Sequence, residues 1–328
     1  MSKAIELCDI SKVYEVYRAR DGNSRSMFRY FRREKVYIPA VRDVSFSIDE
    51  GEVVGFLGSN GAGKTTTLKM LSGIVRPSGG HLSVLGFEPF KRRAEFLKSI
   101  ALVMGQKQQL TWDLPALESL RLHGALYEIP AADCKRRIKE LCELLSADEI
   151  IHRPVRKLSL GERMKCELIL SLLHRPSVLF LDEPTIGLDL EMQVAIRKFL
   201  FDYNKEFGAT IILTSHYMAD IEALANRVIV LDRGQVVFDG GRQALVKAHV
   251  SERRVSLRFS SGVCGESLRA YGNLISLDNE SAELLVPEEQ FAKTVAQLLA
   301  SFPVTDISIQ SPSLEQAFPR LLMPREHA

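Results

Sequence analysis

Long apolar runs are missing from this sequence of 328 residues. No stretch approaches the run of about 18 consecutive apolar residues that marks a membrane-spanning helix. The segment 1–10 carries acidic and polar residues where a signal peptide would have its apolar core. We therefore expect no part of this chain to cross a membrane by itself.

Paired cysteines and a strong charge bias are also lacking. The five cysteines are odd in number and include no CxxC pair, which favours reduced thiols over disulfides or zinc sites. A formal net charge of +2 gives no reason to expect a polyanion, so we expect no nucleic acid partner. With 46% hydrophobic and 26% charged residues, the composition is typical of a soluble globular protein.

The order of the expected elements indicates an α/β fold. Strands at 3–14 and 41–58 alternate apolar and polar residues and predict an antiparallel β flap. Apolar strands at 53–57, 177–181 and 210–214 have helices between them, which favours a sheet buried on both faces. We expect a P-loop type of α/β core, because a glycine-rich turn follows the strand at 53–57.

The chain is long enough for one large core and a smaller second domain. The Gly240-Gly241 pair separates the α/β pattern from short alternating strands and one helix, so it marks the expected boundary. We predict a large α/β domain over 1–240, whose function the motifs below indicate, and a small α+β domain over 241–328. The first domain would contain a basic, aromatic insertion at about 18–38 and a helical subdomain at about 106–165.

The first chemical motif lies between the strand at 53–57 and a helix expected to begin near Thr65. It matches GxxxxGK[ST], a loop whose backbone N–H groups surround phosphate oxygens. Lys64 would reach the β- and γ-phosphates, and the Thr65 hydroxyl would bind Mg2+. The alternative is an ordinary strand–turn–helix junction. The nucleotide-binding residues predicted here are Gly58, Ser59, Asn60, Gly61, Ala62, Gly63, Lys64, Thr65 and Thr66.

The second motif is a pair of acids at the end of the strand at 177–181. Asp182 would bind Mg2+, and Glu183 would act as the general base for the attacking water. Two acids at a strand end are also common in solvated loops. The two motifs together indicate an ATP-hydrolysing site.

The segment Leu158-Ser159-Leu160-Gly161-Glu162 resembles the signature sequence of ATP-binding-cassette (ABC) ATPases. Further segments in the order and spacing of that family extend the resemblance over about residues 3–240. They place Gln106 as the glutamine of the glutamine loop, Gly187-Leu188-Asp189 as the loop after the catalytic acids, and His216 as the switch histidine. Tyr14 resembles the aromatic residue that stacks on adenine, although Tyr17 lies nearby and is the alternative.

The resemblance implies a role for each of these residues. Gln106 and His216 would join Glu183 in catalysis, and Gln106 would complete the magnesium shell with Thr65 and Asp182. Ser159, Gly161 and Asp189 would bind nucleotide, with the signature residues supplied by a second copy or a homologous ATPase in a head-to-tail dimer. Taken singly, each residue has an ordinary structural alternative; only their order favours the site.

The sequence departs from the family pattern at three positions. Leu160 stands where many members have glycine, Glu162 where many have glutamine, and Ser59 where proline is common. Because Ser159 and Gly161 are retained, we expect a working site. The added negative charge of Glu162 is the change expected to tune affinity or rate.

The resemblance implies an ATPase subunit that uses ATP and Mg2+ to power a separate membrane-spanning permease from the cytoplasmic face. The tail 312–318 resembles the extension of ATPases of bacterial drug- and polysaccharide-type exporters, which favours export. Two alternatives are a soluble ABC ATPase acting on nucleic acid or the ribosome, and a regulatory ATP-binding module. The basic insertion is expected either to lie on anionic headgroups or to form a solvated loop.

Overall fold

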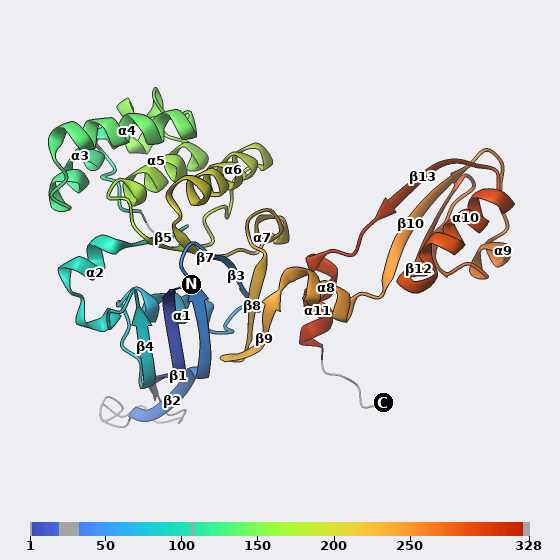
Figure 1. Ribbon diagram of the computed structural model, residues 1–328, viewed down its shortest axis with the longest axis horizontal. Helices are drawn as coiled ribbons and strands as arrows, with labels where there is room; N and C mark the ends of the chain where they lie inside the picture. Colours follow the sequence, from blue (N-terminus) through green and yellow to red (C-terminus); the bar gives the residue numbers. More distant parts are fainter. Residues whose placement is uncertain (1, 20–32, 106–107, 324–328) are drawn as a thin grey trace, which may run out of the picture. The chain divides into compact units, whose positions relative to one another are not determined.

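The computed structural model describes residues 2–19, 33–105 and 108–323 (Figure 1). Gln106 and most of the basic insertion lie outside the described residues. The chain divides into two compact units, Met1–Asp239 and Gly240–Ala328, and each is described by itself. No helix in the described ranges is long and apolar enough to span a bilayer.

A six-stranded sheet forms the centre of the first unit, with strand order β5-β6-β7-β3-β8-β9. The pairs β5–β6, β6–β7, β3–β7 and β3–β8 are parallel. Every residue of β6 and β7 is buried, so the continuous apolar strands do lie in a sheet covered on both faces. The strands are β3 Val53–Gly58, β5 Ile100–Met104, β6 Val178–Asp182, β7 Thr210–Thr214, β8 Arg227–Asp232 and β9 Gln235–Gly241.

The antiparallel flap is a separate sheet with strand order β2-β1-β4. Its strands are β1 Lys3–Ala19, β2 Arg33–Asp49 and β4 Gly79–Val84, so β1 ends later and β2 begins earlier than the sequence predicted. The stretch 41–58 contains the end of β2 and all of β3, which belong to different sheets. The aromatic rings of Phe46 and Phe56 lie 5.8 Å apart between centroids and join the two sheets in one core.

Helices surround the central sheet, and α3, α4 and α5 gather at one end of this unit (Figure 1). In α6 the buried residues Ile196, Phe199, Leu200 and Tyr203 follow helical spacing, so one face packs inward. The helices are α1 Lys64–Leu71, α2 Ala94–Ser99, α3 Ala116–Leu126, α4 Ala131–Leu145, α5 Leu160–Leu172, α6 Leu190–Phe207 and α7 Met218–Leu224; short 3-10 turns are η2 Pro89–Lys91, η3 Ile150–His152 and η4 Val155–Lys157.

The second unit contains a four-stranded antiparallel sheet with order β11-β12-β10-β13. Two helices in the sequence β-α-β-β-α-β make this the split βαβ arrangement of ferredoxin-like folds. The helix pair α8 and α11 flanks it in the sequence. The elements are α8 Arg242–His249, β10 Glu252–Phe259, α9 Gly265–Arg269, β11 Asn273–Leu277, β12 Ser281–Pro287, η5 Glu288–Gln290, α10 Phe291–Ser301, β13 Val304–Gln310 and α11 Leu314–Leu322.

Candidate functional site

The phosphate-binding loop lies between β3 and α1 and relies on glycine at two tight positions. Gly61 and Gly63 have φ angles of 80° and 105°, which side chains rarely adopt. A Cβ on Gly63 would also lie 2.6 Å from the Ala40 carbonyl oxygen. Glycine at these positions therefore leaves the loop backbone and the first turn of α1 free to face phosphate groups.

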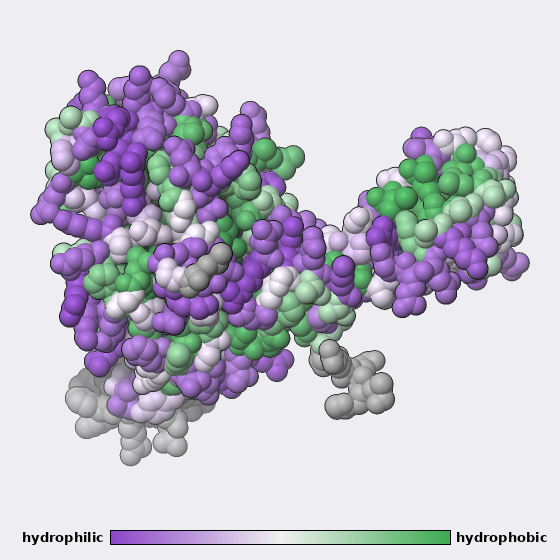
Figure 2. All heavy atoms as spheres, in the orientation of Figure 1, coloured by the Kyte–Doolittle hydropathy of each residue, from purple (hydrophilic) through white to green (hydrophobic). Residues whose placement is uncertain are grey.

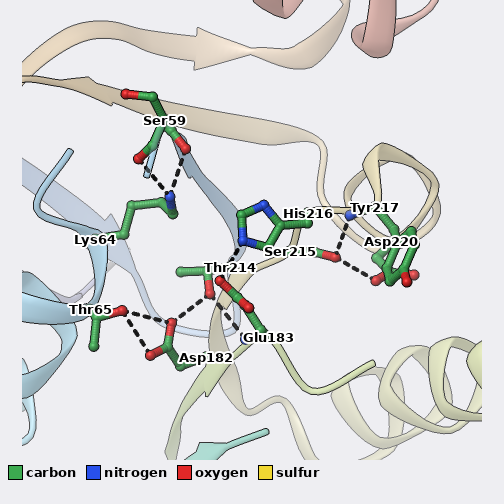
Figure 3. A network of polar contacts seen from close by, with 11 residues as sticks. Ser59, Lys64, Thr65, Asp182, Glu183, Thr214, Ser215, His216, Tyr217 and Asp220 are labelled. Atoms are coloured by element: carbon green, nitrogen blue, oxygen red, sulfur yellow. Dashed lines mark hydrogen bonds and ion pairs between the residues drawn. The ribbon is translucent and has the colours of Figure 1, made fainter. Parts of the chain in front are cut away.

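Lys64 folds back into this loop (Figure 3). Its Nζ donates to the carbonyl oxygen of Gly58 at 2.6 Å and to that of Ser59 at 3.1 Å. Burial lowers the pKa of Lys64, and the charges of Glu183 and Asp182 oppose this shift. The ammonium group is thus held beside the loop, where phosphate oxygens could replace the two carbonyls.

Thr65 and Asp182 bring hard oxygen atoms together next to Lys64. The Thr65 hydroxyl donates to Asp182 Oδ2 at 3.0 Å, and the Thr214 hydroxyl donates to Asp182 Oδ1 at 2.8 Å (Figure 3). Mg2+ prefers one or two protein oxygens together with water and phosphate. No group of three or more His, Cys, Asp or Glu suited to a metal occurs within the described ranges. The Thr65–Asp182 pair therefore fits Mg2+ better than a metal that needs a full protein cage.

Glu183 and His216, which the sequence predicts to be catalytic, contact each other. His216 Nε2 lies 2.8 Å from Glu183 Oε1, and both side chains are partly exposed (Figure 3). Glu183 has a φ angle of 56°, which is strained for a residue with a side chain. Its backbone N–H donates to the Thr214 carbonyl oxygen at 3.1 Å, so the end of β7 helps to hold this conformation.

Gly105 supports Glu183 from the end of β5, a role that the sequence analysis missed. A Cβ at Gly105 would lie 2.3 Å from the Glu183 carbonyl oxygen, and the Gly105 N–H donates to the Asp182 carbonyl oxygen at 3.0 Å. The glycine directly before Gln106 was the available signal. Any side chain at this position would displace the backbone of Glu183.

A buried carboxylate, Asp220, ties three parts of the site together and was also missed. It is 1% exposed, accepts a hydrogen bond from Ser215 Oγ at 2.6 Å and another from the Thr185 hydroxyl. Arg197 on α6 forms an ion pair with it at 3.2 Å. Since Thr185 follows Glu183 and Ser215 precedes His216, Asp220 holds both of the loops that carry Glu183 and His216.

The signature segment forms the start of α5. The Ser159 hydroxyl accepts from the Glu162 N–H at 3.2 Å, and Glu162 Oε2 accepts from the Ser159 N–H at 2.8 Å, which completes a capping box. Arg153 Nη1 donates to Glu162 Oε1 at 2.9 Å. The Ser159 N–H, followed by Arg153, lowers the pKa of Glu162. Glutamate at this position therefore stabilises the helix end that presents Ser159.

Asp189 and Gly161 lie at neighbouring helix starts. Asp189 is the N-cap of α6, and its carboxylate accepts from the Met192 N–H at 2.8 Å. A Cβ on Gly161 would lie 2.8 Å from Met192 Cγ, so the first turns of α5 and α6 pack closely. Within this single chain, Asp189 caps a helix; its predicted contact with nucleotide stays a prediction.

Tyr14 lies on β1 opposite Ile38, close in register to Ala40, whose carbonyl oxygen borders Gly63. The ring is partly exposed, and Lys12 Nζ lies 5.1 Å from its centroid. Tyr17 is further along the strand and 53% exposed. The strand register thus supports Tyr14 as the residue nearer the phosphate-binding loop.

The comparisons with known proteins identify the class of this fold. Residues 41–186 match the ABC transporter family, and residues 251–310 match the C-terminal domain of EvrA-like ABC transporters. The structure of an ATP-binding subunit of an ABC transporter superposes with a TM-score of 0.61 at 24% identity, covering 75% of this chain and 92% of that one.

Curated relatives agree with this class. The ABC transporter ATP-binding protein NatA of Bacillus subtilis is 37% identical over 224 residues, which are 68% of this chain and 91% of NatA. The linearmycin resistance ATP-binding protein LnrL of the same organism is 30% identical over 288 residues, 85% of this chain and 92% of LnrL. The chain belongs to the ABC transporter family of ATP-binding proteins. The fold, the family and the ATPase activity predicted from the sequence are confirmed.

Proposed function

We propose that the residues around Lys64 hydrolyse ATP, with Glu183 as the base that takes a proton from the attacking water. The observation that carries this assignment is the 2.8 Å contact between His216 Nε2 and Glu183 Oε1, at the strand ends beside Lys64 and Asp182. His216 would orient the carboxylate, and Lys64 would stabilise negative charge on the phosphates. Gln106, which lies outside the described residues, stays a proposed third member of the catalytic set.

Thr65 and Asp182 would hold Mg2+, because their oxygens already lie 3.0 Å apart. When bound, Mg2+ supplies positive charge for the phosphate oxygens. Thr214 orients Asp182 through its 2.8 Å hydrogen bond. Gly58–Thr66 would bind the phosphates, and Tyr14 would stack on the adenine ring.

We propose that two ATPase copies meet head to tail. Ser159 and Leu160 at the start of α5 are exposed in the single chain, and Leu160 is 41% exposed. A facing copy could therefore place its own phosphate-bound loop against Ser159 and Gly161. Solved cassettes with this fold, at 21–22% identity, are described as dimeric, one of them bound to ADP and Pi. ATP would favour the closed pair, because its γ-phosphate joins the two surfaces.

We propose further that the chain works at the cytoplasmic face of the membrane on a separate permease and powers export. Relatives at 34–36% identity are named as Nod factor export and doxorubicin resistance ATP-binding proteins. A buried side chain holds the segment after the glutamine loop in place, because Glu167 Oε1 accepts hydrogen bonds from the N–H groups of Gln109 and Leu110. Its outer side chains Trp112 and Leu114 are 48% and 47% exposed and are available to a permease.

The test uses Glu183→Gln, which keeps the shape of the side chain and removes the base. Turnover should fall about 10²–10⁴-fold while ATP binding is retained. With ATP and Mg2+, the variant should accumulate as a dimer and copurify with a multi-span membrane protein. Glu206→Gln, an exposed change on α6, is the matched control and should behave as the unmodified chain.

Normal turnover of Glu183→Gln would refute the catalytic assignment. Copurification with ribosomes or nucleic acid, without a membrane protein, would instead favour a soluble mechanical ATPase.

A further inference from the structure

A groove separates α3 from α4 in the helical part of the first unit. Residues 127–130 join the two helices, which contact each other. The groove has a volume of about 690 Å3, which is within the range of about 300–1,000 Å3 found for small-ligand sites. Its apolar lining includes Leu117, Gly124, Cys134, Ile138, Cys142 and Ile151.

The floor of the groove is closed and apolar. Ile138 is 7% exposed and Cys142 is fully buried. At Gly124 a Cβ would lie 2.5 Å from Cys134 Sγ, so the two helices touch there. The lining residues on α4 follow helical spacing from Ala131 to Cys142, a stripe about 16 Å long. The groove therefore offers an apolar track along the axis of α4.

The rim of this track is mainly basic. The exposed side chains of Arg121, Lys135 and Lys139 line it, together with one acid, Asp148, and His152. Arg121 pairs with Glu118 at 2.9 Å, and Lys139 lies 3.7 Å from Glu143. Lys135 forms no ion pair with any residue that the structure describes. Basic side chains thus lie beside an apolar track, and one of them, Lys135, has no acidic partner among the described residues.

We propose that this groove binds one long-chain carboxylate as a free monomer, with the acyl chain between α3 and α4 and the carboxylate at Lys135. The apolar track matches a carbon chain, and the basic residues of the rim match an anionic head. The ATP site contributes none of the lining residues, so the proposal is independent of the catalytic assignment.

The experiment is calorimetric titration of the full chain with dodecanoate below its micelle concentration. We expect saturable binding of one molecule per chain. Dodecyltrimethylammonium and dodecyl maltoside, which have the same chain but a cationic or neutral head, should bind at least about tenfold more weakly.

Two variants test the two parts of the site. Lys135→Glu with Lys139→Glu should weaken dodecanoate binding about tenfold, and Ala125→Trp, an exposed position that lines the groove, should abolish it. The control is Lys293→Glu, an exposed reversal on α10. Melting temperatures without ligand show whether each variant is folded.

Failure of dodecanoate to bind, equal binding of the cationic amphiphile, or unchanged binding by the charge-reversed variant would each overturn the proposal. Since the charge-reversed residues are exposed, that variant keeps the test valid even if Ala125→Trp does not fold.

Discussion

In the six-stranded sheet, β3, β6 and β7 run in parallel, so their carboxyl ends bring Gly58, Asp182 and Thr214 to one edge. In the four-stranded antiparallel sheet, β10 instead alternates buried Val255 and Leu257 with polar neighbours such as Arg254 and Ser256. The parallel sheet brings polar groups together at one edge, whereas the antiparallel sheet distributes them over one of its faces. Hydrophilic atoms cover most of the visible surface of the first unit, whereas the second shows an apolar patch (Figure 2).

That patch lies beside β13 and α10. Ile309 is 45% exposed and Leu299 is 48% exposed. β13 is an edge strand, so its outer backbone groups have no partner strand within this sheet. Both units have their own apolar core, but only the first also gathers buried polar contacts such as those of Asp182 and Asp220 at one sheet edge.

Asp220→Ala should have the largest effect on the first unit. It removes the partner of Arg197 and the acceptor for Ser215 and Thr185, so we expect a loss of about 3–5 kcal/mol in stability. ATP turnover should fall as the Glu183 and His216 loops loosen. Denaturant unfolding and ATPase rates measure both effects; equal destabilisation of residues 252–310 by hydrogen exchange would contradict the separation of the units.

Leu284→Ala should destabilise the second unit and leave the first unit unaffected. Leu284 is fully buried in the core of the antiparallel sheet, so the cavity should cost about 2–4 kcal/mol. Hydrogen exchange should increase in 252–310 while ATP binding by the purified chain stays unchanged. Leu285→Ala, on the other face of β12, is the matched control; a loss of ATP binding with Leu284→Ala would break the comparison.

Tyr14→Ala tests the boundary of the ATP site at the flap. If Tyr14 stacks on adenine, nucleotide affinity should fall by about 1–3 kcal/mol, a figure taken from base–aromatic stacking. Tyr17→Ala should leave affinity unchanged. The reverse outcome in nucleotide titrations would assign the stacking role to Tyr17.

Glu162→Gln should have the smallest effect, below about 1 kcal/mol near neutral pH, because glutamine can also complete a capping box. The pKa of Glu162 is lowered in the folded chain, chiefly by the Ser159 N–H. Its stabilisation is therefore present above the unfolded pKa of about 4.3 and is lost as pH falls through the lower folded pKa. Acid unfolding curves should show that the variant lacks this loss of stability at low pH. If the variant and the unmodified chain lost stability equally as pH falls, the contribution of the Glu162 carboxylate to the capping box would be ruled out.

Local motifs could be read from the sequence because they need few long-range contacts. Gly63, Lys64, Asp182 and Glu183 belong to short patterns whose geometry follows from a strand end or a helix start. The capping box formed by Ser159 and Glu162 was also predictable from the pattern S-x-x-E. Glu162 was instead interpreted only as a departure from the family pattern.

The supporting residues could not be predicted in the same way. Asp220 acquires its role from Arg197 and Thr185, which are distant in sequence and meet only in the folded chain. The elements α8, β11 and α11 were missed because they are short. β11, for example, has only five residues and is mostly exposed, so its apolar alternation is weak.

The helices α8 and α11 precede and follow the four-stranded sheet in the sequence, and they pack against each other. Leu245, Leu314 and Ala317 are fully buried, and Arg320 Nη1 donates to the His249 carbonyl oxygen at 3.1 Å. The chain thus enters and leaves the ferredoxin-like sheet at one packed helix pair. The two ends of the ferredoxin-like segment are therefore neighbours. Such a segment can be inserted, exchanged or deleted as one unit during evolution, because a short loop is enough to join the two helices in its absence.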